Sequence, residues 1–162
     1  MALSLCGTET SEFDQWFYEH RYSVKPGPNQ LMVASSEGLS MMVKILLEDG
    51  TDPSPATKEG YTALSIAARA NHREVLQLLL EKGADTAVAD MYGYTALHDG
   101  AGNGNTEIVR LLLNSGASAN EVANNGSTAL HEAAVNDHHE VISLLLDNGA
   151  DPSFQIIMGR MR

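Results

Sequence analysis

The sequence predicts an all-α solenoid, in which short helix–turn–helix units joined by hairpin loops stack in one direction. Three observations support this fold class. One pattern recurs four times at a spacing of 33 residues without gaps. Each copy contains two short apolar stretches with helical spacing. Glycine, asparagine or aspartate stands where each first helix must turn into the second. One such helix pair cannot bury its apolar side alone, whereas stacked pairs can.

The repeat is clearest in the last three copies. Residues 60–64, Gly-Tyr-Thr-Ala-Leu, align with residues 93–97 and 126–130, and leucine triplets follow at the same offset in each copy. A weaker copy precedes them. The pattern predicts one repeat domain over residues 24–158, with repeats at about 24–56, 57–89, 90–122 and 123–155. Residues 156–162 are then the start of a fifth repeat or a truncated tail.

The N-terminal segment, residues 1–23, lies outside the repeat register. Ser11 and Asp14 fit the start of a helix, and Phe13, Trp16 and Phe17 follow helical spacing after it. We expect this helix to cover the apolar flank of the first repeat, as a solenoid requires. A peptide ligand or a membrane-surface helix is the alternative, but the segment's acidic residues disfavour anionic membranes.

Within each repeat, the boundaries of the helices follow from single residues. We expect the first helices to begin after an N-cap at Asn29, Thr62, Thr95 or Thr128, because these side chains can accept from free backbone N–H groups. Left-handed turn residues are expected at Gly38, Asn71, Gly104 and Asp137. The second helices should end at Gly50, Gly83, Gly116 and Gly149.

The residues that recur in each copy resemble the ankyrin repeat, whose motif runs G-x-T-P-L-H-x-A-A, followed by a turn, a leucine-rich helix and G-A-D. The chain carries, for example, GSTALHEAAVNDHHEVISLLLDNGAD. Alanine replaces the motif proline in the three clear copies, and the motif histidine is present only at His98 and His131. The resemblance implies that these histidines form local hydrogen bonds. It also implies that partners dock on a concave face made of the hairpin tips and the first helices.

The stretch Gly-Ala-Gly-Asn-Gly-Asn at residues 100–105 invites a different interpretation, because glycine-rich turns can bind phosphate. A phosphate loop follows a strand and opens a helix. The repeat register instead places Gly100 and Gly102 in a first helix and Gly104 in its turn, so we expect no nucleotide site. Replacing Gly100 with alanine should leave the melting temperature unchanged or raise it, provided that the neighbouring helix has room.

Composition excludes several function classes. The formal net charge is −11, which disfavours nucleic acid, and no apolar run approaches the roughly 20 residues of a membrane span. The single cysteine, Cys6, allows no internal disulfide and fits an intracellular, cytoplasmic or nuclear, setting. The spacing of the histidines and carboxylates predicts no metal, cofactor or catalytic residues. We therefore expect a non-enzymatic protein.

When the residues are aligned by their position in the repeat, the resemblance places a candidate protein-binding site on the concave face. Its centre is expected at Tyr61, Met91, Tyr92 and Tyr94, since exposed tyrosine and methionine are common in interface hot spots. Truncating Tyr92 or Tyr94 should then weaken binding and leave stability unchanged, unless these rings brace the hairpins instead. The full predicted set is Lys58, Glu59, Tyr61, Ile66, Arg69, Met91, Tyr92, Tyr94, Asp99, Asn103, Asn124, Asn125 and Glu132.

The sequence thus predicts a non-catalytic protein–protein interaction module whose partner has a basic surface. The alternative is a small regulatory protein that inhibits or targets an enzyme such as a kinase. The apolar flank of the fourth repeat lacks a visible cap, so self-association through this C-terminal end is a further expectation.

Overall fold

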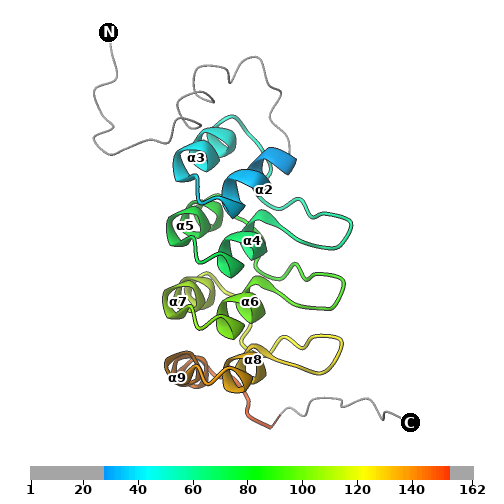
Figure 1. Cartoon of the computed structure of the whole chain (residues 1–162), viewed down its shortest axis with the longest axis vertical. Helices are drawn as coiled ribbons and strands as arrows, with labels where there is room; N and C mark the ends of the chain where they lie inside the picture. Colours follow the sequence, from blue (N-terminus) through cyan, green and yellow to red (C-terminus); the bar gives the residue numbers. More distant parts are fainter. Residues whose placement is uncertain (1–27, 154–162) are drawn as a thin grey trace.

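The computed structural model describes residues 28–153, which form a stack of four helix pairs (Figure 1). The first helices of the pairs lie in one column beside the hairpin loops, and the second helices form a parallel column behind them. This arrangement confirms the predicted all-α solenoid. The pairs are α2 (Pro28–Ser36) with α3 (Ser40–Glu48), α4 (Ala63–Arg69) with α5 (Arg73–Glu81), α6 (Ala96–Gly102) with α7 (Thr106–Asn114), and α8 (Ala129–Val135) with α9 (His139–Asp147).

The predicted threonine caps are confirmed. Thr62, Thr95 and Thr128 have extended backbones, and each forms a capping box with the residue three positions later. Thr95 and Thr128 pair with the motif histidines. In repeat 2 a serine takes the same role: Ser65 N–H donates to Thr62 Oγ1 at 3.1 Å, and Thr62 N–H donates to Ser65 Oγ at 3.0 Å. Serine therefore replaces histidine without loss of the cap.

The expected cap at Asn29 is wrong. Helix α2 begins at Pro28, so Asn29 lies inside the helix. Proline has its φ already fixed near the helical value and needs no N–H partner, which suits the first position of a helix. The predicted N-terminal capping helix and the tail at residues 156–162 lie outside the described residues.

The left-handed turns are confirmed, and they are coupled to the next repeat. Gly104 has a φ of 70° and Asn71 a φ of 60°. A Cβ placed on Gly104 would lie 2.5 Å from His138 Nδ1, because the imidazole of the following repeat covers this turn. His138 Nε2 lies 3.0 Å from the Gly102 carbonyl oxygen. Over Asn71 the corresponding residue is Asn105, whose amide donates to the Ala68 carbonyl at 3.1 Å.

One continuous apolar core runs along the stack between the two helix columns. The core is closely packed at Gly100, where the other clear repeats have alanine. A Cβ on Gly100 would lie 3.0 Å from Cγ2 of the fully buried Ile108. The neighbouring helix therefore has room for this methyl group only if Ile108 shifts by a few tenths of an ångström. At the two corresponding positions, the flanking repeats pair alanine with the smaller valine. These pairs are Ala67 with Val75 in repeat 2 and Ala133 with Val141 in repeat 4.

Within residues 28–153, no helix is both long enough and apolar enough to cross a membrane.

Candidate functional site

Backbone hydrogen bonds join the hairpin tips of neighbouring repeats into one edge. The Met91 N–H donates to the Glu59 carbonyl at 2.8 Å, and the Asn124 N–H donates to the Tyr92 carbonyl at 2.9 Å. The side-chain amide of Asn124 adds a bond to the Met91 carbonyl at 3.0 Å. We call this edge, together with the adjoining side of α4, α6 and α8, the hairpin–helix face. Met91 and Tyr92 are the most exposed large apolar side chains of the hairpin tips, at 59% and 56%.

Repeats 2 and 3 meet on this face through a tyrosine, an arginine and an aspartate. Arg69 Nε and Nη2 donate to Asp99 Oδ1 at 3.2 and 3.0 Å. The guanidinium carbon of Arg69 lies 5.0 Å from the centroid of the Tyr61 ring, a distance typical of a cation–π contact. Half of the Arg69 side chain is exposed, whereas Asp99 is 13% exposed. The carboxylate of repeat 3 therefore fixes an arginine that projects from repeat 2.

Repeats 3 and 4 meet through Tyr94. Its hydroxyl donates to Glu132 Oε1 at 3.2 Å and accepts from Asn125 Nδ2 at 3.1 Å. Its ring packs edge-on against His98, with centroids 5.3 Å apart and planes 74° apart. Ser127 Oγ also donates to Glu132 Oε1. These contacts favour the alternative expectation for Tyr94, that it braces the hairpins, because its ring and hydroxyl connect two repeats.

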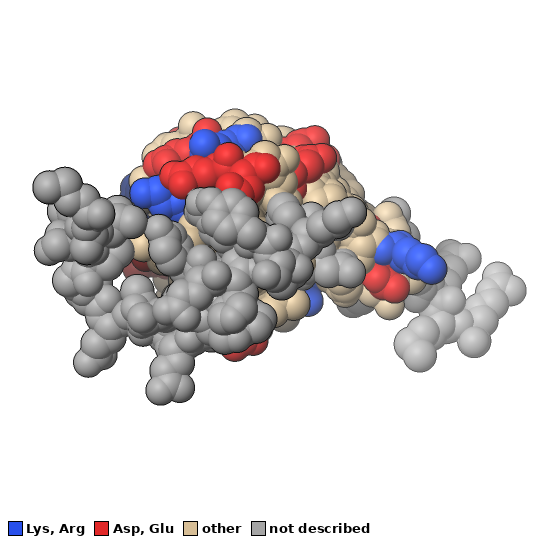
Figure 2. Space-filling view, turned by 90° about the horizontal axis from the view of Figure 1, so that it is seen from above, with Lys and Arg blue, Asp and Glu red and all other residues tan. Residues whose placement is uncertain are grey.

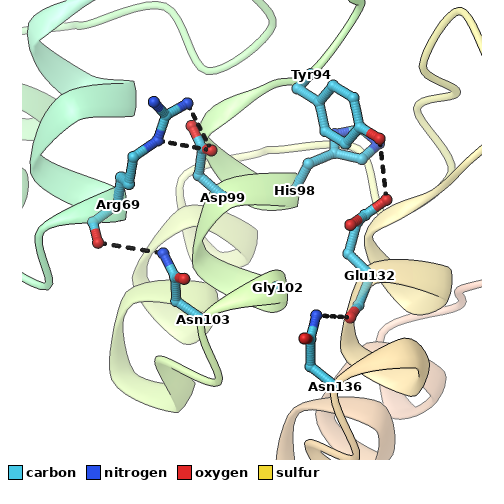
Figure 3. Close-up of a pocket in the computed structure, with 8 residues that line it drawn as sticks. All are labelled: Arg69, Tyr94, His98, Asp99, Gly102, Asn103, Glu132 and Asn136. Carbon is cyan, nitrogen blue, oxygen red and sulfur yellow. Dashed lines mark hydrogen bonds and ion pairs between the residues drawn. The ribbon is translucent and has the colours of Figure 1, made fainter.

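A hollow of about 300 Å³ lies between these two junctions, where first helices α4, α6 and α8 follow one another (Figure 3). Asn103 Nδ2 donates to the Arg69 carbonyl at 3.1 Å, and Asn136 Nδ2 donates to the Glu132 carbonyl at 2.9 Å. Gly102 lies between these two asparagines and has no side chain to fill the hollow. The hollow is lined by Arg69, Tyr94, His98, Asp99, Gly102, Asn103, Glu132 and Asn136.

Burial alters the titration of three groups around the hollow. It raises the pKa of Asp99, and the ion pair with Arg69 opposes this shift. It also raises the pKa of Tyr94, so the hydroxyl keeps its proton at neutral pH and can donate to Glu132. Burial lowers the pKa of His98. His98 is also neutral on geometric grounds, because its Nδ1 accepts from the Thr95 N–H at 3.1 Å and its Nε2 lies 3.3 Å from the Ser127 carbonyl oxygen.

The structure sorts the predicted site residues into two groups. Arg69, Tyr94, Asp99, Asn103 and Glu132 surround the hollow. The others lie outside its lining: Lys58, Glu59, Met91, Tyr92, Asn124 and Asn125 are exposed, whereas Tyr61 and Ile66 are half-buried.

Three lining residues were missing from the predicted set. Gly102 and Asn136 occupy the same repeat columns as Arg69 and Asn103, so the repeat period contained the signal for both. His98 was predicted only to form local hydrogen bonds. It reaches the hollow because its ring extends beyond its capping box toward the next hairpin.

Acidic side chains gather on the face seen along the stack from its N-terminal end, where fewer Lys and Arg side chains are visible (Figure 2). The sequence as a whole has 21 acidic residues against 10 Lys and Arg. Within the described residues, no three His, Cys, Asp or Glu side chains are placed to hold a metal ion together. The hairpin–helix face itself presents the exposed side chains of Met91 and Tyr92 and the carboxylates of Asp99 and Glu132.

Comparison with protein families agrees with this geometry. A family described as ankyrin repeats (3 copies) matches residues 6–90 and 86–156. The chain belongs to the ankyrin-repeat family. Ankyrin repeats are in general protein–protein interaction modules and are typically non-catalytic. No curated protein matches the chain. The ankyrin motif histidines form the predicted local hydrogen bonds, since His98 and His131 complete the capping boxes of α6 and α8.

Proposed function

We propose that the hairpin–helix face of this ankyrin-repeat protein binds another protein, with Met91 and Tyr92 at the centre of the contact. The observation that carries the proposal is that these two large side chains are exposed side by side on an edge held by backbone bonds. Methionine and tyrosine are enriched in protein interfaces. Because the edge is already ordered, little backbone entropy is lost on binding.

The net charge of −11 favours a partner with a basic surface and opposes nucleic acid. An intracellular partner remains part of this proposal. Inhibition or targeting of an enzyme such as a kinase is the alternative use of the same face, and activity assays on a captured enzyme would test it.

Affinity capture with matched variants tests the proposal. Tyr92→Ala should weaken retention of a specific partner by about 2 kcal/mol, or roughly 30-fold, while the unfolding midpoint stays close to wild type. The control is Gln77→Ala, which truncates an exposed side chain of α5 in the second-helix column. Equal retention by Tyr92→Ala and wild type, or equal loss with Gln77→Ala, would contradict docking on the hairpin–helix face.

Self-association through the C-terminal end remains a separate proposal. Leu146 on α9, in the last described helix pair, is 44% exposed. If this flank pairs with a second copy, Leu146→Glu should abolish any concentration-dependent increase in sedimentation coefficient. A wild-type chain that sediments as a monomer at all concentrations would exclude this contact.

A further inference from the structure

Two successive junctions of the hairpin–helix face use the same three repeat positions, but the second has no cation. The first contains Tyr61, Arg69 and Asp99; the second contains the residues 33 positions later, which are Tyr94, Gly102 and Glu132. In the first, the guanidinium lies over the tyrosine ring and donates to the aspartate. In the second, a ring and a carboxylate are again present, but glycine supplies no cation.

The hollow lies where the second arginine would be. A Cβ on Gly102 would meet only Glu132, at 3.6 Å from its Cβ and 3.9 Å from Oε2. Glu132 Oε2 therefore faces the space above Gly102. The hollow has a volume of about 300 Å³ and opens between α6 and α8 (Figure 3).

Most hydrogen-bond donors around the hollow have partners within the chain, whereas several acceptors have none among residues 28–153. Most of its side-chain donors are engaged within the chain: the amides of Asn103 and Asn136 donate to carbonyl groups, the Tyr94 hydroxyl donates to Glu132, and Arg69 Nε and Nη2 donate to Asp99. Four oxygens accept no hydrogen bond from any residue within 28–153: Asp99 Oδ2, Glu132 Oε2, Asn103 Oδ1 and Asn136 Oδ1. The amide oxygens of Asn103 and Asn136 point toward the Gly102 side (Figure 3).

A chemical group that binds in this hollow should therefore donate hydrogen bonds, carry positive charge and require no hydrogen-bond donor from the hollow. The two carboxylates exceed the single lining cation, Arg69, so an acidic occupant would be repelled. A guanidinium has five N–H donors, no acceptor and a planar shape that packs against an aromatic ring. The ammonium group of lysine carries the same charge, but it is not planar and cannot donate two parallel hydrogen bonds to one carboxylate.

We propose that this hollow binds the guanidinium of an arginine of the partner protein, placed between Tyr94 and Glu132 as Arg69 is placed between Tyr61 and Asp99. The inference rests on the proposed function, since it supposes that a protein docks on this face. It adds the chemistry of one contact: an arginine that projects from the partner and enters beside Gly102.

Titration with short peptides tests the inference directly. The probe is acetyl-Gly-Ser-Arg-Ser-Gly-amide, with lysine and citrulline peptides as controls, added to 15N-labelled protein. The arginine peptide should cause saturable shifts at the backbone amides of Gly102, Asn103 and Glu132. The lysine peptide should bind at least fivefold more weakly, and the uncharged citrulline peptide should cause no saturable shift.

Two variants sharpen the result. Gly102→Arg supplies a guanidinium from within the chain, as Arg69 does one repeat earlier, and should abolish peptide binding. The matched control Gln77→Arg adds a guanidinium on α5, outside the hollow, and should retain wild-type affinity within about twofold because Gln77 is exposed there. The 15N spectrum of each variant reports whether its fold is intact.

The inference is overturned if no peptide binds, if citrulline binds as well as arginine, or if Gly102→Arg still binds. None of these results bears on capture of a partner through Tyr92, which tests the proposed function separately. Conversely, unchanged partner capture by Tyr92→Ala would contradict the proposed function even if arginine peptides bind beside Gly102.

Discussion

Repeats 2 and 3 have the same helix boundaries, yet they differ at three alternate positions near the turn between their helices. Repeat 2 has Ala67, Arg69 and Asn71, whereas repeat 3 has glycine at 100, 102 and 104. Each glycine meets a different neighbour: Ile108 for Gly100, Glu132 for Gly102 and His138 for Gly104. A glycine-rich stretch can thus have three independent physical causes. They are a larger residue on the paired helix, an open hollow at the surface and a ring from the next repeat.

The largest effect is expected at Gly104. Gly104→Ala places a side chain at a φ of 70° and brings its Cβ to 2.5 Å from His138 Nδ1. Left-handed backbone costs roughly 1–2 kcal/mol, and overpacking adds about 1–3 kcal/mol. We expect the free energy of unfolding, measured with urea, to fall by about 3 kcal/mol.

Gly116→Ala is the matched control, because Gly116 has a φ of 91° but no atom lies within 4 Å of the place that its Cβ would take. It should lose only the backbone part, about 1 kcal/mol. The double variant Gly104→Asn with His138→Asn copies the Asn71–Asn105 pair and should be more stable than Gly104→Asn alone. If it is not, the turn residue and the covering side chain are not coupled.

A smaller loss is expected for Gly100→Ala. Alanine favours the helix by about 1 kcal/mol, but its Cβ would lie 3.0 Å from Ile108 Cγ2 in a buried contact. We expect the crowding to outweigh the gain, with a net loss of about 1 kcal/mol.

Repeats 2 and 4 indicate how to reverse this loss, since they combine alanine with valine in these columns. Ile108→Val removes one methyl group and lets the shorter side chain move aside. On its own it should cost about 0.5–1.5 kcal/mol. Together with Gly100→Ala it should cost less than the sum of the two single changes. Strict additivity in this double-mutant cycle would show that the two positions do not compensate each other.

The repeat period predicted the helices well because their ends depend on local residues. The threonine caps and left-handed turns need only a side chain and a few neighbouring backbone groups, so a column of sequence contains the information. The room beside Gly100 could not be predicted in this way, because it depends on how closely Ile108 approaches from the second helix. The column pattern did contain a signal, since Ile108 is larger than the valines aligned with it.

The hollow was only partly predictable for a related reason. Its walls come from three successive repeats, and the columns placed most of its residues on one face. That the amides of Asn103 and Asn136 donate within the chain, and so leave their oxygens free, depends on side-chain directions that a repeat register does not define. The half-burial of Tyr94 was likewise missed, because Glu132 and Asn125 lie 38 and 31 residues away.

Repeats 2 and 3 also differ in the residue that completes the cap, Ser65 or His98, and this difference should appear as a pH effect. Burial lowers the pKa of His98 in the folded protein below the roughly 6.5 of an unfolded chain. Well above pH 6.5 this imidazole is unprotonated in both states, so its contribution to stability is complete. As the pH falls further, the unfolded state binds the proton first and stability decreases.

His98→Ser should keep the capping box, as Ser65 does, and should remove this part of the pH dependence. The measurement is the urea midpoint at pH 7.5 and 5.5 for both proteins. The wild type should lose more stability over this interval than the variant, although the variant is less stable at pH 7.5 because it leaves a cavity. Equal losses would show that the buried imidazole does not titrate differently in the two states.

The smallest effect is expected at Gly102, and its sign is opposite to the others. The backbone is helical there, and an added Cβ would lie 3.6 Å from Glu132 Cβ, an ordinary contact. Gly102→Ala should therefore stabilise the protein, by about 0.5 kcal/mol rather than the full difference of about 1 kcal/mol, since Gly102 ends helix α6. The test is a urea midpoint compared with that of Gly100→Ala. A measured stabilisation would show that folding gains nothing from glycine at position 102. The need for an open hollow that a partner can enter would then explain the glycine better than stability does. A loss equal to that of Gly100→Ala would instead show that glycine is needed here for packing, and that the three positions do not differ in kind.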